Sequence, residues 1–231
     1  MDIAASIQVI LNEAVLAIAR YVHQQTQQEN LCLAGGVALN VVAMGKLSRE
    51  GSFRQLWIQP AAGDAGGALG AALWFWHQKL SNMITPIQPD AMQGAFLGTN
   101  IPPASELDDA MLERLEAVWQ VHSEKTLQGL IAQKLAEGKV VPVARGRMEF
   151  GLRALGARSI LGDARSPYMQ SQMNLKIKFR ESFRPFAPMV LAEDAAEYFE
   201  IQQESPYMLL ACLSGEREQT ATRSNKGSIR H

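Results

Sequence analysis

Apolar residues recur three and four positions apart along the beginning of the chain. The residues with this spacing are Ile3, Ile7, Ile10, Leu11, Ala14, Val15 and Ile18. Side chains three and four apart share one face of a helix. The pattern therefore predicts an amphipathic helix over about residues 3–28.

Strand and helix patterns then alternate along the chain. The strands are expected at 31–36 and 53–60, and the helices at 37–51 and 61–80. We expect the first strand to be buried and to end in a glycine turn. Gly51 closes the first of these helices, Pro60 stops the second strand, and the second helix follows a turn through Gly63 and Asp64. This order is typical of an α/β fold.

Residues 81–105 interrupt the alternation. They carry prolines at 86, 89, 102 and 103 and show little periodicity. Such a composition marks a connection rather than a packed element. We expect a first domain over 1–85, a linker over 86–105 and a second domain over 106–213.

The second domain is expected to mix helices and strands. Helices are predicted at 106–117, 126–138, 167–178 and 193–199, and strands at 118–122, 139–145, 185–191 and 207–213. Residues 214–231 contain almost nothing to bury, so we expect a disordered tail.

The composition is that of a globular protein, with 47% hydrophobic and 19% charged residues. The two cysteines, Cys32 and Cys212, lack paired spacing, which favours a reducing compartment. No apolar run approaches the ~20 residues of a membrane span, and the acidic N-terminal pattern is unlike a signal peptide. We therefore expect a cytoplasmic protein.

Charge is distributed unevenly along the chain. Between Lys139 and Arg184 there are ten basic and three acidic residues, whereas the remainder has twelve basic and twenty acidic residues. A basic segment in a chain whose net charge is −1 indicates an anionic ligand.

Two glycine-rich segments follow the two predicted strands of the first domain. In LAGGVALN, Gly35 and Gly36 allow a ligand to approach the backbone, and Asn40 is placed to bond a nucleotide. In GDAGGALG, Asp64 precedes three helix-weakening glycines, which favours a phosphate or metal site. The structural alternatives are a tight turn in the first segment and an N-cap at Asp64 in the second.

The arginine-rich segment GRMEFGLRALGARSIL and its continuation NLKIKFRESFRPFAP give the strongest signal. Arginine presents a planar fork that grips phosphate in two places, so several arginines on glycine turns predict a small anion pocket. The structural alternative is a set of ion pairs, such as Arg147 or Arg153 with Glu181. The histidines at 23, 77, 122 and 231 show no metal-ligand spacing.

These segments, in this order, resemble the carbamoyltransferase family that includes nodulation-type and antibiotic-tailoring O-carbamoyltransferases. LAGGVALN and GDAGGALGAAL resemble the end of its actin-like ATPase-fold domain, and GAFLG at 94–98 resembles the start of its second domain. The arginine-rich segment and its continuation resemble the signature of that YrdC-like α/β domain. The resemblance covers roughly residues 30–212.

The resemblance implies an ATP-dependent enzyme that carbamoylates a hydroxyl group of a small molecule. Carbamoyl phosphate would be cleaved in the YrdC-like domain, and the carbamoyl group would pass through carbamoyl-adenylate. The implied carbamoyl phosphate pocket is Arg147, Arg153, Arg158, Lys178, Arg180 and Arg184, with Arg153, Arg158, Lys178 and Arg180 catalytic. The implied nucleotide site is Gly35, Gly36, Asn40, Asp64 and Gly66, and Asp64 is also the implied ligand of a divalent metal, Fe or Mg.

Three departures from the family pattern limit this expectation. Leu152 stands where the family has proline, the family's metal-binding histidines precede the matched region, and the match stops near Leu213. We therefore expect a fragment that does not complete the reaction alone. The alternatives are a polyanion-binding module, such as one for RNA, or a structural module. No membrane or nucleic-acid partner is expected, and a homodimer stays open.

Overall fold

The computed structural model describes residues 2–102, 106, 109–116, 118–201 and 203–214. The chain divides into two compact units. The first unit consists of residues up to Gly94, residues 151–153 and the segment from Met189 on. The second unit consists of Ala95–Phe150 and Ala154–Pro188.

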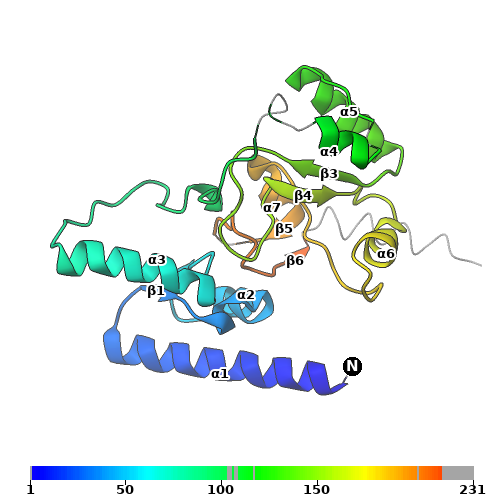
Figure 1. The fold of residues 1–231 in the computed structure, drawn as a ribbon. Helices are drawn as coiled ribbons and strands as arrows, with labels where there is room; N and C mark the ends of the chain where they lie inside the picture. Colours follow the sequence, from blue (N-terminus) through cyan, green and yellow to red (C-terminus); the bar gives the residue numbers. More distant parts are fainter. Residues whose placement is uncertain (1, 103–105, 107–108, 117, 202, 215–231) are drawn as a thin grey trace, which may run out of the picture. The chain divides into compact units, whose positions relative to one another are not determined.

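The N-terminal part of the first unit alternates helices with two short strands (Figure 1). In chain order it contains α1 (Asp2–Thr26), β1 (Asn30–Leu33), a 3₁₀ turn (Gly36–Leu39), α2 (Val41–Glu50), β2 (Gln55–Ile58), α3 (Asp64–Trp74) and a π turn (Phe75–Lys79). The two strands run parallel, with Cys32 opposite Trp57. The predicted α/β alternation is confirmed, although the helix expected over 37–51 is split at Asn40.

The core of this part lies between α1 and α2. Met44 and Leu47 of α2 are almost completely buried, and Leu16 and Ala19 of α1 are 4% exposed. Leu16 and Ala19 are three positions apart and share one face of α1, whereas in α2 the consecutive residues Ala43, Met44 and Gly45 are all buried. The strand expected to be buried is not, because Cys32 of β1 is exposed.

Helix α1 has a second apolar face that nothing in the described part of the chain covers. Ile3, Ile7, Ile10 and Ile18 are each more than 60% exposed. By length and composition alone, α1 is apolar enough to cross a membrane, a test that soluble core helices also pass. The expectation that no segment approaches a membrane span is therefore wrong for this helix.

The C-terminal segment of the described chain also belongs to the first unit. It contains a 3₁₀ turn (Ala192–Asp194), α7 (Ala195–Tyr198) and the antiparallel pair β5 (Phe199–Glu200) and β6 (Leu213–Ser214). The strands expected at 185–191 and 207–213 are wrong, apart from Leu213 in β6. In place of a strand ladder, single residues of the segment 203–211 form hydrogen bonds with the rest of the unit. The side chain of Gln203 bonds both backbone groups of Leu56, and the Ala211 N–H bonds the Val41 carbonyl.

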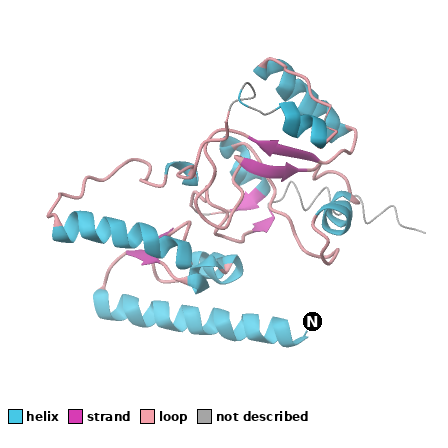
Figure 2. Cartoon of the chain, viewed as in Figure 1, coloured by secondary structure: helices cyan, strands magenta, loops and turns pink. Residues whose placement is uncertain are grey.

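The second unit holds α4 (Asp109–Arg114), α5 (Glu124–Ala136), β3 (Val141–Ala144), β4 (Arg158–Leu161), α6 (Met169–Gln172) and a π turn (Met173–Ile177). Strands β3 and β4 are antiparallel, with Ala144 opposite Arg158. Loops separate these short elements, as Figure 2 shows. The strand expected at 118–122 is absent from its described residues, and β4, inside the arginine-rich segment, was not predicted.

Part of the expected linker is built into the second unit. The backbone of residues 95–101 bonds that of residues 146–150, including Gly98 N–H to the Met148 carbonyl and Phe150 N–H to the Ala95 carbonyl. The actin-like and YrdC-like folds and the domain limits at 85, 105 and 213 stay predictions. Of the expected disordered tail, 215–231 lies outside the described residues.

Candidate functional site

A cavity of about 500 Å³ opens beyond the carboxyl ends of β1 and β2 in the first unit. Its lining residues are Ala34, Gly35, Gly36, Gln59, Ala61, Ala62, Gly63, Asp64, Gly66 and Gly67. Ligands of open parallel sheets bind at this end of the strands. Gly35, Gly36 and Asp64, three residues of the implied nucleotide site, thus line one cavity.

The glycines of this cavity differ in what they contribute. The backbone at Gly35 has a φ of 97°, which residues other than glycine rarely adopt. A Cβ at Gly66 would collide with the Ala61 carbonyl oxygen. At Gly36 and Gly67 a Cβ would meet nothing within 4 Å. The protein's own packing therefore does not require glycine at these two positions. Their missing side chains leave room for a ligand close to the backbone.

Asp64 is the first residue of α3, and the cap is Gly63, so the predicted N-cap role of Asp64 is wrong. Its side chain makes no hydrogen bond or ion pair with the described part of the chain. A helix N-terminus presents free N–H groups as well. The carboxylate is therefore available to a cation at the edge of the cavity.

Asn40 lies outside the residues that line the cavity. Its side chain accepts a hydrogen bond from the Ala43 N–H and so caps α2, and it exchanges hydrogen bonds with Gln8 of α1. An N-cap of this kind contributes about 1 kcal/mol to helix stability. Its nucleotide-binding role stays a prediction beside this structural one.

The arginine-rich segment of the second unit is organised by Glu149. The side chain of Glu149 is fully buried, and its Oε1 accepts hydrogen bonds from the backbone N–H groups of Leu155, at 2.7 Å, and Ala157, at 2.8 Å. Burial acts to raise the pKa of Glu149, but the backbone donors together outweigh it and hold the pKa below its usual value. Glu149 is therefore a buried carboxylate.

Arg147 and Arg158 lie on either side of this carboxylate in the sequence and bond differently. The Arg147 guanidinium donates to the carbonyls of Leu97 and Gly98, both at 3.0 Å. The Nε of Arg158 lies 3.4 Å from Glu149 Oε2, and the Arg158 side chain is 47% exposed. Arg147 is thus engaged in holding two loops together, whereas Arg158 keeps an exposed end.

The basic residues of 178–184 lie on a loop that Asn174 holds. Asn174 is completely buried and donates to the carbonyls of Ser182 and Arg184. It accepts from the Nε of Arg180, at 2.6 Å, and the Arg180 guanidinium lies over the Phe186 ring. Lys178 and Arg184 are exposed. Asn174 gave no signal in the sequence, because its amide bonds backbone carbonyls, which no residue type marks.

Arg153 belongs to the first unit, whereas the other five residues of the predicted pocket belong to the second. Its guanidinium donates to the Leu39 carbonyl at 3.2 Å, and its Nε is buried without a partner among the described residues. A pocket shared by all six residues stays a prediction. The suggested ion pair of Arg147 with Glu181 is wrong, because Arg147 bonds two carbonyls and Glu181 pairs with Arg184 at 3.9 Å. The suggested pair of Arg153 with Glu181 would join the two units and stays a prediction.

No group of three or more metal-ligating side chains occurs within the described ranges. His23 packs edge-on against Phe53, and the ring of His77 bonds the Asn82 carbonyl. Asp64, the predicted metal ligand, is thus not part of a cluster of three or more such side chains within the described ranges.

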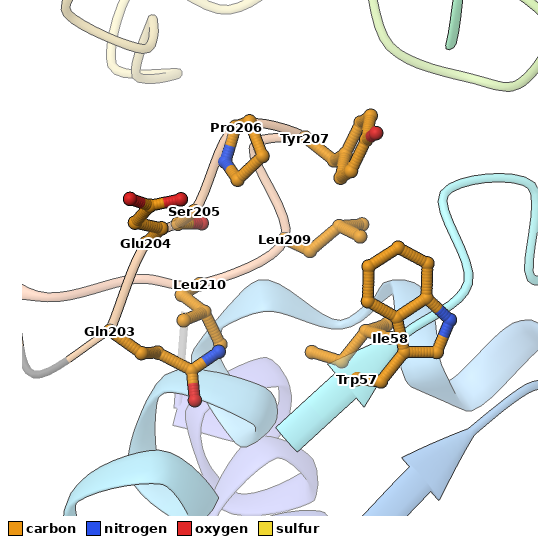
Figure 3. A pocket seen from close by; sticks show the side chains of 9 residues that line it. All are labelled: Trp57, Ile58, Gln203, Glu204, Ser205, Pro206, Tyr207, Leu209 and Leu210. Atoms are coloured by element: carbon orange, nitrogen blue, oxygen red, sulfur yellow. The ribbon is translucent and has the colours of Figure 1, made fainter. Parts of the chain in front are cut away.

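A second, much smaller cavity of about 50 Å³ lies between β2 and residues 203–210 (Figure 3). Trp57 and Tyr207 line it and meet edge to face, with ring centroids 6.1 Å apart. The volume suits one or two water molecules at most. We therefore regard it as a packing gap beside the Gln203 contact.

Models of one protein family match both ends of the chain. The model of the carbamoyltransferase N-terminus matches residues 1–73, and the model of the carbamoyltransferase C-terminus matches residues 132–228. The first match contains the glycine-lined cavity, and the second contains Glu149, Arg158 and the loop held by Asn174.

Curated relatives match nearly the whole chain. An uncharacterized protein of Synechocystis is 57% identical over 91% of this chain and 34% of its own length. Nodulation protein NolNO of Sinorhizobium fredii is 40% identical over 90% of this chain and 30% of its own. Nodulation protein NolO of Bradyrhizobium diazoefficiens is 39% identical over 90% of this chain and 37% of its own. The chain thus spans about a third of the length of these relatives.

Proposed function

This chain belongs to the carbamoyltransferase family, and from that premise we propose that it supplies part of an ATP-dependent O-carbamoyltransferase. The donor is carbamoyl phosphate and the acceptor is a hydroxyl group of a small molecule. Carbamoyl phosphate is cleaved with release of inorganic phosphate, and the resulting carbamate displaces pyrophosphate from ATP to give carbamoyl-adenylate. The acceptor hydroxyl then attacks the carbamoyl carbon and AMP leaves. The chain spans about a third of these relatives' length, and the proposal for it concerns two binding sites of this reaction.

The observation that carries this proposal is the cavity beyond β1 and β2. Its volume of about 500 Å³ lies within the range of ligand pockets, roughly 300–1,000 Å³. Gly36 and Gly67 leave the backbone open, and the first turn of α3 adds backbone N–H groups that no capping side chain bonds. Backbone N–H groups and open glycines together suit the phosphates of a nucleotide.

Of the two divalent metals expected, Mg²⁺ fits this arrangement and iron does not. Mg²⁺ is commonly held by one or two carboxylates together with substrate phosphates and water. Asp64, with a free carboxylate at the cavity, would hold Mg²⁺ in this way and thereby neutralise nucleotide phosphate. The described residues do not offer the ligand set that an iron site requires.

The second unit is the proposed site of the donor phosphate. Arg158 is half exposed, Lys178 and Arg184 are exposed, and Arg180 is held by Asn174 and Phe186. Fixed guanidinium groups bind phosphate strongly, because less side-chain entropy is lost when the ligand binds. This supports a role for these residues in binding carbamoyl phosphate.

The proposal is tested by adding one methyl group at either of two glycines of α3. A Cβ at Gly67 or at Gly70 meets nothing within 4 Å, but only Gly67 lines the cavity. Each substitution by alanine favours the helix by roughly 1 kcal/mol. We expect Gly67→Ala to weaken Mg–ATP binding about tenfold in calorimetry, a change of about 1.4 kcal/mol.

Gly70→Ala is the matched control and should leave Mg–ATP affinity unchanged. Asp64→Asn should reduce the Mg²⁺ dependence of ATP binding while leaving the melting temperature unaltered. Equal ATP affinity for the wild type and Gly67→Ala would contradict a nucleotide site in this cavity.

A further inference from the structure

Glu149 holds the main chain and the side chain of one arginine at once. Its Oε1 accepts from the backbone N–H of Arg158 at 3.4 Å, in addition to the shorter bonds from Leu155 and Ala157. Its Oε2 faces the Nε of the same arginine at 3.4 Å. The β3–β4 pairing fixes the main chain here as well, because Arg158 lies opposite Ala144.

Oε2 depends on Arg158 in a way that Oε1 does not. Oε2 is buried and accepts no hydrogen bond within the described part of the protein, so the guanidinium of Arg158 is its compensating charge. A desolvated carboxylate oxygen attracts such a charge far more strongly than an exposed one does. The Nε edge of the guanidinium is therefore directed to Glu149.

The other edge of Arg158 remains available. The side chain is 47% exposed, and its two terminal nitrogens donate no hydrogen bond in the described ranges. These two nitrogens form the end-on fork of the guanidinium, which matches two oxygens of a phosphate. An arginine tied at Nε thus presents this fork in one orientation.

We propose that Glu149 is the positioning residue that fixes Arg158 with its terminal fork directed at the phosphate of the carbamoyl donor. The inference rests on the proposed function, since it takes the donor phosphate as the ligand. Glu149 itself does not touch the ligand. It divides its two oxygens between the loop and the arginine, so the two roles can be separated by a single substitution.

Glu149→Gln makes that separation. The amide oxygen can still accept from Leu155 and Ala157, whereas the amide nitrogen replaces the oxygen that faces Arg158. Asp163→Asn is the matched control, because Asp163 binds the exposed Arg165 of the same unit, at 2.7 Å, with no expected role in the pocket. The binding of inorganic phosphate to the full chain is measured by calorimetry for each variant, alone and combined with Arg158→Ala.

We expect Arg158→Ala to weaken phosphate binding about tenfold and Glu149→Gln to weaken it about fivefold, as expected for a charge-assisted contact. In the Arg158→Ala background, Glu149→Gln should have almost no further effect. Asp163→Asn should leave phosphate affinity unchanged in both backgrounds. The NMR signal of the Arg158 Nε–H should move in Glu149→Gln, since its carboxylate neighbour is gone.

Two failures are distinguishable. If Arg158→Ala leaves phosphate affinity unchanged, the phosphate role of Arg158 in the proposed function is wrong, and this inference fails with it. If Arg158→Ala weakens binding but Glu149→Gln has no effect, or an equal effect with and without Arg158, Glu149 only holds the loop and the inference alone is overturned.

A second variant keeps the inference testable if Glu149→Gln does not fold. Arg158→Lys retains the charge, but a single ammonium cannot contact Glu149 and present a fork to phosphate at the same time. Its phosphate affinity should fall nearly as far as that of Arg158→Ala. Wild-type affinity in Arg158→Lys would overturn the inference.

Discussion

The phenol oxygen of Tyr207 lies 2.8 Å from both carboxylate oxygens of Asp90, a residue 117 positions earlier in the chain. Tyr207 is 4% exposed, and Asp90 also accepts a hydrogen bond from the Met92 N–H. Both residues belong to the first unit. This contact ties the segment after β2 and α3 to the C-terminal segment that packs on the same unit.

Removing the Tyr207 hydroxyl should destabilise the first unit. A hydrogen bond to a charged group contributes about 1.5–3 kcal/mol, so Tyr207→Phe should lower the free energy of unfolding by about that amount. Urea unfolding measures this. Tyr168, which is 78% exposed, provides the control, and Tyr168→Phe should change stability by less than about 0.5 kcal/mol. Equal effects of the two substitutions would contradict a structural role for the Asp90 contact.

The same contact predicts an alkaline transition. Burial, reinforced by the hydrogen bond to Asp90, raises the pKa of Tyr207 to about 12 from 10.0. A raised pKa stabilises the protonated form of the folded protein, so this contribution is fully present below pH 10 and is lost as the pH rises toward 12. Unfolding midpoints between these pH values should fall more steeply for the wild type than for Tyr207→Phe. Equal pH dependence of the unfolding midpoint in the wild type and Tyr207→Phe would contradict the raised pKa of Tyr207.

A third prediction concerns the packing of α2 against the C-terminal segment. A Cβ at Gly45 would collide with the carbonyl oxygen of Ala211. Gly45→Ala should therefore destabilise the protein by about 1–3 kcal/mol, although alanine favours a helix. In α5 a Cβ at Gly129 meets nothing within 4 Å, so Gly129→Ala should be neutral or stabilising by up to about 1 kcal/mol. Chemical denaturation should show a lower free energy of unfolding for Gly45→Ala and an equal or higher one for Gly129→Ala. A higher free energy of unfolding for Gly45→Ala would contradict the close approach of Gly45 to the Ala211 carbonyl.

The sequence predicted helices better than strands, for a physical reason. Helices α1 and α5 are specified by local spacing, and the Ser123 side chain caps α5 by accepting from the Thr126 N–H. Strand β4 depends on a partner, β3, that its own residues do not reveal. Conversely, the apolar run at 207–213 is typical of a strand, but its contacts go mainly to a helix end and to side chains.

The sequence predicted only part of the candidate site, because only that part follows from the local pattern. Gly35 and Asp64 each follow a strand, and the carboxyl ends of parallel strands meet, so a shared cavity follows from the pattern. The partners of the arginines do not follow from it. Glu149 bonds residues six to nine positions away through a folded loop, and Asn174 bonds the carbonyls of residues eight and ten positions away.

The buried carboxylate of Glu149 should make the stability of the folded protein sensitive to acid. Because the backbone donors of its loop hold the pKa of Glu149 below the usual value despite burial, the ionised form stabilises the folded state. This contribution is present above the ordinary pKa of 4.5 and is lost as the pH falls through the lowered folded value. Unfolding midpoints measured from pH 7 down to about pH 3 should fall for the wild type and change less for Glu149→Gln. A steeper fall in Glu149→Gln would contradict the lowered pKa.

The buried amide of Asn174 should matter more than a neighbouring exposed amide that bonds the same loop. Asn174→Ala removes a completely buried side chain that donates to the Ser182 carbonyl, is one of two donors to the Arg184 carbonyl and accepts from the Nε of Arg180. Because unsatisfied buried groups cost about 1–3 kcal/mol each, the variant should lose about 2–4 kcal/mol of stability. Phosphate affinity should fall as well, since the loop carrying the basic residues is no longer fixed.

Gln170 offers the comparison for this prediction. Its exposed amide donates to the carbonyls of Phe183 and Arg184, where water can replace it, so Gln170→Ala should cost less than about 1 kcal/mol. Thermal unfolding and phosphate calorimetry on both variants decide the matter. Asn174→Ala with the stability of Gln170→Ala would show that burial of the amide does not hold the loop, and the order of the basic residues would need another cause.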